Sequence, residues 1–591
     1  MSRVLGDFRL VGYRIMWASS YQKRGWVFVR LGAVVIAVFA WALGGQTGAF
    51  AGSTPAYSLG TVGAYGGEPS IASDGRGVLY DTTPSGGTIL YRSTDNGQTW
   101  AQATTADPAS GDDCLATDQA NALYLCNLAG SEGVAPLQAD SWKSLDHGTT
   151  WSHGAGAIPQ CATSCSPFGV DRDWEAAAIP AGGTTSTAEV VLMYHDFYGP
   201  SQIWVNISHD GGATFGAPQE VLASPAVTPG AVTGTLVAQG YTFCNTVPAG
   251  VQIVKPGLPH AGRIYVAWIA ADLAQNATGC NISMLQSFHT LWVSYSDDNG
   301  ATWTPQQAFD AGVGHDASTP FVGFTLDDKG NPYFGFAQNL NSNPASCSAE
   351  STAGTVQSDP SCEYDMYVVW SSNGALSWDG GGGLIAGSAA KPYRVNALRE
   401  TGTHFFPAIA AGDPGHVDVA YLRTPEILPT DSFGKADPGG CGGPGPANGN
   451  PTTYPPPCNW NLYGAQSLNL TLSPAKATWT TTQITTTPMH IGDICNLGIF
   501  CVAPSSNRNL LDFISETVDP KGCAHIAYAD DNTVNKLRVA NQTAGTCVIG
   551  KNHAAITASV SITAGLMVPA SAVVWRRRWV RPRRQANRVS G

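Results

Sequence analysis

Charged side chains in this 591-residue chain stand just before, or at the start of, short apolar segments where β-strands are expected to begin. The densest group is Asp-Arg-Asp-Trp-Glu at 171–175, in which Arg172 lies between Asp171 and Asp173. A guanidinium can hold a carboxylate through two hydrogen bonds, and neighbouring carboxyl groups can transfer protons. The other members of this set are Glu68, Asp112, Asp113, Glu175, His315, Asp316, His404, Arg508 and Asp512. They can act together only if the fold brings several strand starts to one place.

An eight-residue pattern indicates which elements would do this. Ser-x-Asp-x-Gly-x-Thr-Trp, with Phe as an alternative last residue, occurs at 93–100, 144–151, 208–215 and 296–303, and a weaker copy stands at 371–378. Each copy follows an alternating apolar run, which is typical of a hairpin turn between strands. The glycine permits positive φ, and the aspartate can accept hydrogen bonds from the amides of the turn. The central aspartates of the four good copies are 51, 64 and 88 residues apart, a spacing that favours blades of four strands over a short fixed repeat.

This pattern resembles the Asp-box, or bacterial neuraminidase repeat, of the sialidase-like β-propellers, and the resemblance spans residues 66–540. It implies an all-β fold, a single β-propeller of four-stranded blades. In that family the boxes lie on the outer edges of the blades, away from the active centre. The box residues are therefore interpreted as structural.

Seven segments have the form of an inner strand or its partner with turn residues nearby, and seven blades are predicted, with six, the number in sialidases, as the alternative. The segments are 68–81, 114–126, 171–196, 263–270, 321–336, 406–422 and 513–530. Blades six and seven contain no recognisable box. The last blade lacks one strand, and residues 58–62 are predicted to pair there, which closes the ring and removes an exposed edge.

The resemblance also implies roles for residues at the mouth of the central channel. A sialidase of this fold needs three arginines that clamp the substrate carboxylate, a tyrosine nucleophile activated by a glutamate, and an aspartate acid or base. Arg172, Arg399 and Arg508 are the candidates for the clamp. Asp173 would be the acid or base, and Glu175 would activate Tyr194. His315, Asp316, His404 and Asp512 are further candidates for substrate binding.

Two features depart from the sialidase pattern. The Arg-Ile-Pro motif is missing from the body of the chain, because the nearest text, Gly-Tyr-Arg-Ile-Met at 12–16, precedes the predicted export segment. The body is also acidic: residues 52–553 hold 18 of the 31 basic residues and 42 of the 43 acidic ones, a formal charge of −24. Such a field opposes binding of nucleic acid and anionic sugars and favours cations or neutral glycans.

The two ends of the chain predict export and anchoring. Residues 1–51 carry basic residues, an apolar stretch and small residues before Ala51, which is typical of a signal peptide. Cleavage after Ala51 is expected, with a start at Met16 or an uncut anchor as alternatives. Residues 554–575 are uncharged and long enough to span a bilayer, and the basic segment 576–591 follows as a predicted cytoplasmic tail. The alternative for this end is a final strand pair with a basic tail.

All fourteen cysteines lie in the body, and their even number, the export signal and the short spacings predict local disulfides. Consecutive pairing gives Cys114–Cys126, Cys161–Cys165, Cys244–Cys280, Cys347–Cys362, Cys441–Cys458, Cys495–Cys501 and Cys523–Cys547, although sequence alone leaves the connectivity open. No Cys-x-x-Cys pair occurs, which disfavours a zinc site.

Two functions remain open from the sequence. The first is an exported, surface-anchored glycoside hydrolase of the exo-sialidase type that acts on extracellular glycans. The second is a catalytically inactive propeller that binds a glycan, a protein or a cation at its channel face. No cofactor or metal is assigned, but calcium could bind among Asp171, Asp173 and Glu175, since hard cations favour carboxylate oxygens. In both cases the expected partner is an extracellular glycan or glycoprotein, and the chain is expected to be a monomer.

Overall fold

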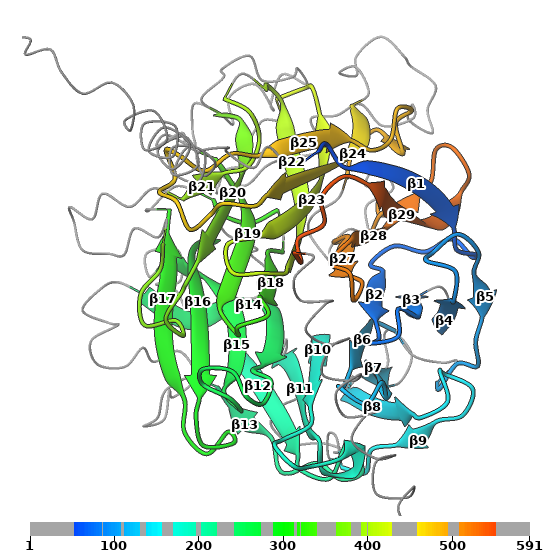
Figure 1. Cartoon of the computed structure of the whole chain (residues 1–591), viewed down its shortest axis with the longest axis vertical. Coiled ribbons are helices and arrows are strands. Elements are labelled where there is room, and N and C mark those ends of the chain that lie inside the picture. The colour runs from blue at the N-terminus through cyan, green and yellow to red at the C-terminus, as the bar shows by residue number, and fades with distance from the viewer. Residues whose placement is uncertain are drawn as a thin grey trace, which may run out of the picture. The chain divides into compact units, whose positions relative to one another are not determined.

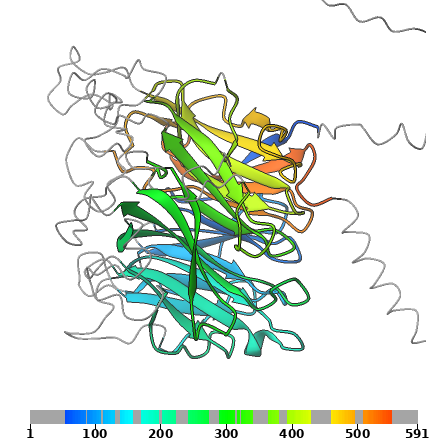
Figure 2. The same ribbon diagram turned by 90° about the vertical axis from the view of Figure 1, so that its left-hand side faces the viewer.

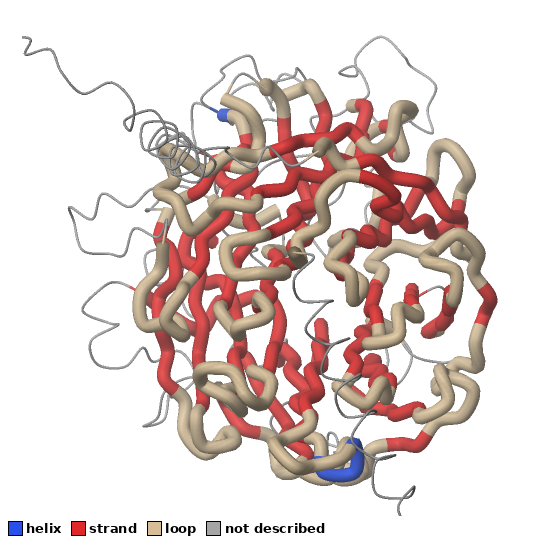
Figure 3. Tube along the Cα trace, in the orientation of Figure 1, coloured by secondary structure: helices blue, strands red, loops and turns tan. Residues whose placement is uncertain are grey.

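Antiparallel pairing of short strands accounts for almost all regular structure in the computed structural model of the chain. The structure describes residues 53–84, 87–107, 111–129, 138–156, 170–196, 202–221, 241–272, 288–311, 316–319, 321–339, 362–379, 392–398, 400–427, 458–494 and 507–550. Within these ranges the one named helix is the 3-10 turn η1 (Thr185–Thr187), drawn in blue in Figure 3.

The first four blades are separate four-stranded sheets, numbered here in chain order from β2. Blade 1 contains β2 (Ser70–Ser73), β3 (Leu79–Pro84), β4 (Thr88–Ser93) and β5 (Ala101–Gln102). Blade 2 contains β6 (Asp113–Thr117), β7 (Leu123–Ala129), β8 (Gln138–Ser144) and β9 (Ser152–His153). Blade 3 contains β10 (Val170–Ala178), β11 (Glu189–Asp196), β12 (Gln202–Ser208) and β13 (Gln219–Glu220). Blade 4 contains β14 (Tyr241–Ile253), β15 (Ile264–Asp272), β16 (Phe288–Ser296) and β17 (Thr304–Asp310).

Blades 5 and 6 are joined into one nine-stranded sheet by a single parallel pair, Tyr364 with Thr403. Blade 5 contains β18 (Gly323–Leu326), β19 (Pro332–Asn339), β20 (Tyr364–Trp370) and β21 (Tyr393–Arg394). Blade 6 contains β22 (Thr403–Ala411), β23 (Val417–Thr424), β24 (Asn459–Ser467) and β25 (Thr480–Gln483), and β26 (His490–Ile491) also pairs with β24. Blade 7 contains β27 (Ser515–Val518), β28 (Ala524–Asp530), β29 (Lys536–Ala544) and β1 (Ala56–Thr61).

The first strands of the blades form a closed ring. In order, β2, β6, β10, β14, β18, β22 and β27 each contact the next, and β27 contacts β2 again. Most of these strands are labelled around the middle of Figure 1, and Figure 2 shows the strands from the side. The described strands thus make a seven-bladed propeller, the number favoured from the sequence. We call the face where the first strands begin the mouth face, and the opposite face, where the third strands end, the box face.

The predicted closure of the ring by the N-terminal strand is confirmed. β1 pairs antiparallel with β29, so that Ser58 lies opposite Asn541 and Gly60 opposite Val539. The outermost strand of blade 7 therefore comes from the other end of the described chain, and the third strand is not left as a free edge.

The Asp-boxes are the turns between the third and fourth strands, as predicted. In the box at 93–100, Ser93 Oγ accepts from Gly97 N at 2.9 Å, Asp95 Oδ1 accepts from Thr99 N at 2.9 Å, and Asn96 and Gly97 both have positive φ. The box at 144–151 repeats this arrangement around Ser144 and Asp146. These bonds satisfy the amides of the turn locally.

Each of several boxes is also held by a side chain of the preceding blade. Asn541 Nδ2 of blade 7 donates to Gly97 O at 3.0 Å, and Lys143 Nζ of blade 2 donates to Gly211 O at 2.5 Å. Arg263 Nη1 of blade 4 donates to Gly374 O at 2.6 Å. The boxes therefore connect neighbouring sheets, which is the role expected for structural repeats.

Blade 6 contains a box that the sequence pattern missed. Ser467 and Asn469 occupy the first two box positions, Thr478 N donates to Asn469 Oδ1 at 2.9 Å, and Trp479 follows. Five extra residues separate Asn469 from Thr478 compared with the regular boxes, and Asn replaces Asp. A search for the regular spacing cannot detect such a copy.

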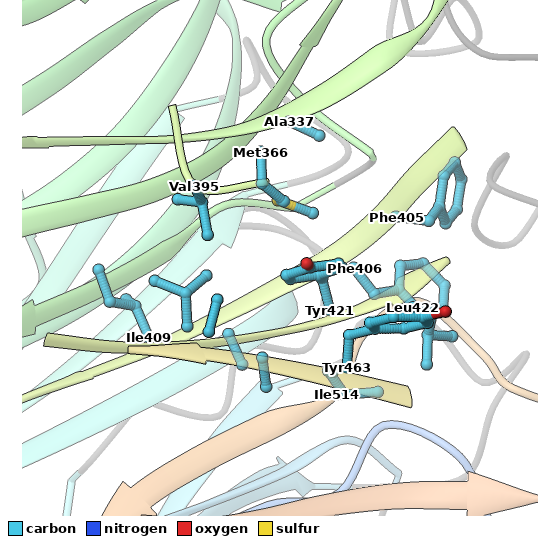
Figure 4. Close-up of a cluster of buried hydrophobic side chains, with 14 of the residues drawn as sticks. Ala337, Met366, Val395, Phe405, Phe406, Ile409, Tyr421, Leu422, Tyr463 and Ile514 are labelled. Atoms are coloured by element: carbon cyan, nitrogen blue, oxygen red, sulfur yellow. The ribbon is translucent and has the colours of Figure 1, made fainter. Parts of the chain in front are cut away.

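The largest apolar cluster lies between blades 5, 6 and 7. It includes Met366 of β20, Phe405 of β22, Tyr463 of β24 and Ile514 before β27, which are among the side chains labelled in Figure 4. Facing sheets in a propeller pack with their apolar side chains interdigitated, so this cluster fixes the relative position of the three sheets.

Two of the predicted disulfides are confirmed, Cys114–Cys126 and Cys523–Cys547. Cys362 and Cys458 are disulfide-bonded as well, but their predicted partners lie outside the described residues, as do the pairs at 161–165 and 495–501. The predicted signal at 1–51, the predicted span at 554–575 and the basic tail also lie outside them. Among the residues that are described, no helix has the length and apolar character needed to cross a bilayer.

Candidate functional site

The first strands of all seven blades line one central cavity of about 180 Å³ on the ring axis. Charged side chains reach this region from the strand starts, as expected: Glu68 precedes β2, Asp112 precedes β6, Arg172 lies near the start of β10, and Asp512 precedes β27. The fold therefore brings together residues that are more than 400 positions apart in the chain, in the case of Glu68 and Asp512.

A β-bulge aims Arg172 at the centre. Asp171 pairs with His195 and Asp173 pairs with Tyr194, so Arg172 is an extra residue in β10 with φ of 62°. Glu68, with φ of 50°, is also in the left-handed region. Non-glycine residues adopt this region at a cost of about 1 kcal/mol or more, and such residues collect where a side chain must be redirected.

Arg172 is surrounded by three carboxylates. Its two terminal nitrogens form a bidentate pair with Glu68, Nη2 lies 2.5 Å from Asp512 Oδ2, and Nη1 lies 3.3 Å from Asp112 Oδ2. Arg508 Nη1 donates to Asp512 Oδ1 at 2.9 Å. The guanidinium of Arg172 is therefore already saturated by acceptors of the protein itself.

The pKa values in this cluster diverge. Burial, together with the nearby Asp512 and Asp112, raises the pKa of Glu68 well above its usual range even beside Arg172. Burial also acts on Asp512, but the charges of Arg172 and Arg508 outweigh it and hold its pKa below the usual range. The two cations thus favour an ionised Asp512, while Glu68 tends to keep its proton.

Three aromatic rings cover this cluster. Phe321 before β18 and Phe513 before β27 lie with their ring centres 5.2 Å and 5.4 Å from the Arg172 guanidinium carbon, a cation–π arrangement. Trp174 contacts both rings, with centroid distances of 6.1 Å to Phe321 and 6.4 Å to Phe513. We call Trp174, Phe321 and Phe513 the aromatic triad. All three line the cavity and remain partly exposed.

A second acidic group lies beside this cluster, between blades 1, 2 and 3. Asp113 Oδ1 accepts from Thr82 Oγ1 at 2.5 Å, and Glu175 Oε1 accepts from Ser141 Oγ at 2.5 Å. Both oxygens of Asp173 and Oε2 of Glu175 are buried without a hydrogen-bond partner. Burial raises the pKa of Asp173 well above its usual range and that of Glu175 to about 8. Glu175 therefore keeps its proton at neutral pH.

Tyr194 is hydrogen-bonded through its hydroxyl within its own blade. It lies on β11 opposite Asp173, and its hydroxyl donates to Asn206 Oδ1 of β12 at 2.6 Å. Its ring packs into the apolar cluster between blades 2 and 3. The phenol is thus held by the third strand of its own blade, and the proposed activation of Tyr194 by Glu175 stays a prediction.

The other candidate residues from the sequence lie outside the Arg172 cluster or outside the described part of the chain. Asp316 Oδ2 accepts from Tyr364 Oη at 3.2 Å, which links the start of blade 5 to its third strand. His404 Nδ1 donates to Tyr364 O at 2.7 Å in the interior of blades 5 and 6, where burial lowers its pKa to about 3. Arg399 and His315 are not among the described residues. Of the three arginines expected to form a clamp, Arg172 and Arg508 share Asp512.

A family model for the BNR/Asp-box repeat matches residues 91–102, which include the first box and the ends of the strands on both sides. The chain thus contains a BNR/Asp-box repeat at these residues. It is similar in structure to the α-L-arabinanase of Penicillium chrysogenum, with 13% identity, a TM-score of 0.36, and coverage of 63% of this chain and 93% of the arabinanase. A polysaccharide lyase of family PL25 that acts on ulvan gives 11% identity and a TM-score of 0.40 over 86% and 99% of the two chains. The leech intramolecular trans-sialidase gives 12% identity and a TM-score of 0.33 over 84% and 69%.

No group of three metal-ligating side chains was found among the described residues of this Asp-box protein. The side chain of Asp171, one of the three residues suggested for calcium, is not described, whereas Asp173 and Glu175 both face the acidic group between the blades. The site as described thus contains several carboxyl groups with raised pKa values, and an arginine, Arg172, that is paired with carboxyl groups of the protein itself.

The aromatic triad of the Asp-box protein was not singled out from its sequence. Trp174 was noted only as part of 171–175, and Phe321 and Phe513 carry no charge. Phe321 and Phe513 lie just before the first strands of two blades. The charged candidates were chosen because they occupy such positions, so the same criterion could have identified these two aromatic residues.

Proposed function

We propose that this Asp-box propeller recognises a neutral glycan at its mouth face, and that Arg172 holds the residues of this site in position. The observation that carries the proposal is the saturated guanidinium beneath three partly exposed aromatic rings. Aromatic faces stack well on the C–H faces of sugar rings, and concave sites with a few buried polar groups are typical binding sites for small ligands.

A sialic acid is a poor match for this arrangement. A carboxylate clamp needs guanidinium donors that are free to bind the substrate, whereas Arg172 is bound by Glu68, Asp112 and Asp512. Arg508 also donates to Asp512. Displacing buried carboxylates from Arg172 would leave them unpaired, which costs several kcal/mol.

Hydrolysis of a neutral glycoside is a second candidate, and Glu175 favours it. A carboxyl group that keeps its proton at neutral pH can serve as the general acid that protonates a leaving oxygen. Asp173, two positions away on the same strand, would be its carboxyl partner, and because its pKa is raised, the ionised form that it needs as a base would be lost in acidic medium. Tyr194 has no role in this version of the reaction.

The site is proposed to act outside the cell. The disulfides Cys114–Cys126 and Cys523–Cys547 are typical of exported proteins and support the predicted signal at 1–51. Anchoring by residues 554–575 is retained as part of the proposal.

Binding of the purified full-length chain to immobilised neutral oligosaccharides and to sialylated oligosaccharides tests the proposal. We expect binding to members of the neutral set, at least tenfold weaker binding for Trp174→Leu and Phe513→Leu, and no binding to sialosides. Trp100→Phe, in the first box, is the matched control and should leave binding unchanged, because Trp100 lies on the box face. Binding or cleavage of sialosides, or no binding to any neutral glycan, would contradict the proposal.

The hydrolase version is tested separately by release of reducing ends from the oligosaccharides that bind. Glu175→Gln should remove this release and retain binding. Binding without release in the unmodified chain would leave the recognition function in place and exclude hydrolysis of those glycans.

A further inference from the structure

A pair of carboxyl groups lies between blades 6 and 7, where Asp418 is buried and the half-buried Glu516 also lines the central cavity. Asp418 on β23 is fully buried, and Glu516 on β27 accepts from Ala420 N of blade 6 at 3.2 Å through Oε2. Gln466 Nε2 donates to Asp418 Oδ2 at 3.0 Å. The remaining oxygens, Asp418 Oδ1 and Glu516 Oε1, are buried and receive no other donor from the described residues, and the two carboxyl groups are hydrogen-bonded to each other.

The closing strand contributes the third titratable group of this region. The hydroxyl of Tyr57 on β1 is buried without a hydrogen-bond partner, and its ionisation is opposed by the charges of Asp418 and Glu516. The region therefore joins the second strand of blade 6, the first strand of blade 7 and the strand that completes the ring.

Among the described residues, no basic side chain compensates these carboxyl groups. The titratable groups that act on Asp418, Glu516 and Tyr57 from the described elements around them are these three themselves, and Gln466 on β24 is neutral. Tyr463 on β24 and Ile514 just before β27 belong to the apolar cluster drawn in Figure 4, which lies on the same elements. Ionising both carboxyl groups would place two like charges in a buried space without a cation, which is strongly unfavourable.

We propose that Asp418 and Glu516 form a proton-operated latch, which holds β1 and blade 7 against blade 6 in acidic medium and loosens as the medium becomes alkaline. In the closed state the pair retains at least one proton. Loss of that proton to solvent leaves charged carboxylates, and blade 7 with its N-terminal strand is the part of the ring that can separate, because β1 is held there by pairing to one strand, β29.

The direction of the pH effect follows from burial. Burial raises the pKa of Asp418 to about 6, and burial together with the charge of Asp418 raises that of Glu516 well above its usual range. Both groups have ordinary values of about 4 in an unfolded chain. The stability that they contribute is therefore complete below pH 4 and is lost as the pH rises through 6 and beyond.

Hydrogen exchange of the full-length chain between pH 5 and pH 8.5, corrected for the intrinsic rate, tests the latch. We expect the opening equilibrium of β1 and β29 to increase roughly tenfold per pH unit above pH 6, relative to β15 in blade 4. Glu516→Gln and Asp418→Asn keep the shape and leave one ionisable carboxyl group, so each should reduce the pH dependence of the opening of β1, and the double variant should remove it in this range.

The control variant is Glu189→Gln. Glu189 lies on β11, and burial raises its pKa to about 7, but no carboxyl partner acts on it. This variant should retain the pH-dependent opening of β1. Equal pH dependence of β1 and β15 in the unmodified chain, or an unchanged pH dependence of β1 in both amide variants, would overturn the proposal.

Discussion

Arg172 of blade 3 and Asp512 of blade 7 face each other across the ring axis, with Nη2 2.5 Å from Oδ2. This contact spans the centre of the ring, since the first strands of blades 3 and 7 are not neighbours in the circle of strands. Together with Glu68 of blade 1 and Asp112 of blade 2, it makes the guanidinium of blade 3 the common partner of three other blades.

Replacement of Arg172 by Met should therefore destabilise the ring by about 3–5 kcal/mol at pH 8, because the buried carboxyl groups lose their shared guanidinium and keep only Arg508 nearby among the described cations. The loss should be smaller at pH 5, where the carboxyl groups can take up protons. Urea unfolding at the two pH values measures both effects. Arg76→Met is the matched control: Arg76 pairs with Asp74 at 3.0 Å but its side chain is 49% exposed, so a change below about 1 kcal/mol is expected. Equal effects of the two substitutions would contradict the central role of Arg172.

The first box can show whether the aspartate position needs a hydrogen-bond acceptor or a negative charge. Asp95→Ala removes the acceptors of Thr99 N and Thr99 Oγ1 and should cost about 1–2 kcal/mol. Asp95→Asn should be close to neutral, because Asn373 and Asn469 already fill this position in the fifth and sixth boxes and make the equivalent bonds. Thermal unfolding of the two variants checks this difference. If the Asn variant were as unstable as the Ala variant, the negative charge and not the acceptor would be what the box requires.

His404 should weaken the protein in acid. Because its folded pKa of about 3 lies below the value of about 6.5 for an unfolded chain, its contribution to stability is complete above pH 6.5 and is lost as the pH falls. His404→Gln can keep a donor for Tyr364 O and should reduce the loss of stability between pH 6.5 and pH 4. Chemical unfolding over this range measures the slope. An unchanged slope would mean that His404 does not remain neutral in the folded protein.

The disulfide between Cys523 and Cys547 should stabilise the C-terminal end of the ring. It closes a loop with a sequence separation of 24 and fixes the segment that follows β29 to the turn between β27 and β28. A loop of this length corresponds to about 3 kcal/mol in the chain-entropy treatment. Replacing both cysteines by Ser should lower the unfolding midpoint and increase proteolysis after β29. Unchanged proteolysis would show that Val548 N to Gly522 O and the neighbouring backbone bonds hold this segment alone.

The repeated turns made the fold predictable from the sequence. Individual side-chain contacts across the ring axis could not be predicted. The Ser-x-Asp-x-Gly pattern is a local signal, since Ser93, Asp95 and Gly97 bond within one turn. The closure by β1 was predictable because a blade with three strands leaves an edge that must be covered. The box at Ser467 escaped detection because an insertion changed its spacing while its hydrogen bonds were kept.

The sequence predicted the location of the candidate site better than it predicted the roles of the individual residues. Strand starts correctly placed Glu68, Arg172 and Asp512 together, because the connectivity of a propeller brings these positions to the axis. The ion pairs that form in the site depend on the β-bulge at Arg172. The periodicity of the sequence alone does not reveal a bulge. Residues with two plausible environments, such as His404 and Tyr194, were therefore harder to place than the residues of the turns.

The pairing of β1 with β29 also dictates an order of assembly. β1 leaves the ribosome before any blade exists, and its partner strand is made only after six blades have been synthesised. Until then the chain carries an unpaired strand at its start, exposed to wrong pairing with other chains, and the seventh sheet cannot be completed. The first strand of the described chain is thus the last one to find its place in the ring. Truncation near the end of β29 would therefore release the N-terminal strand as well.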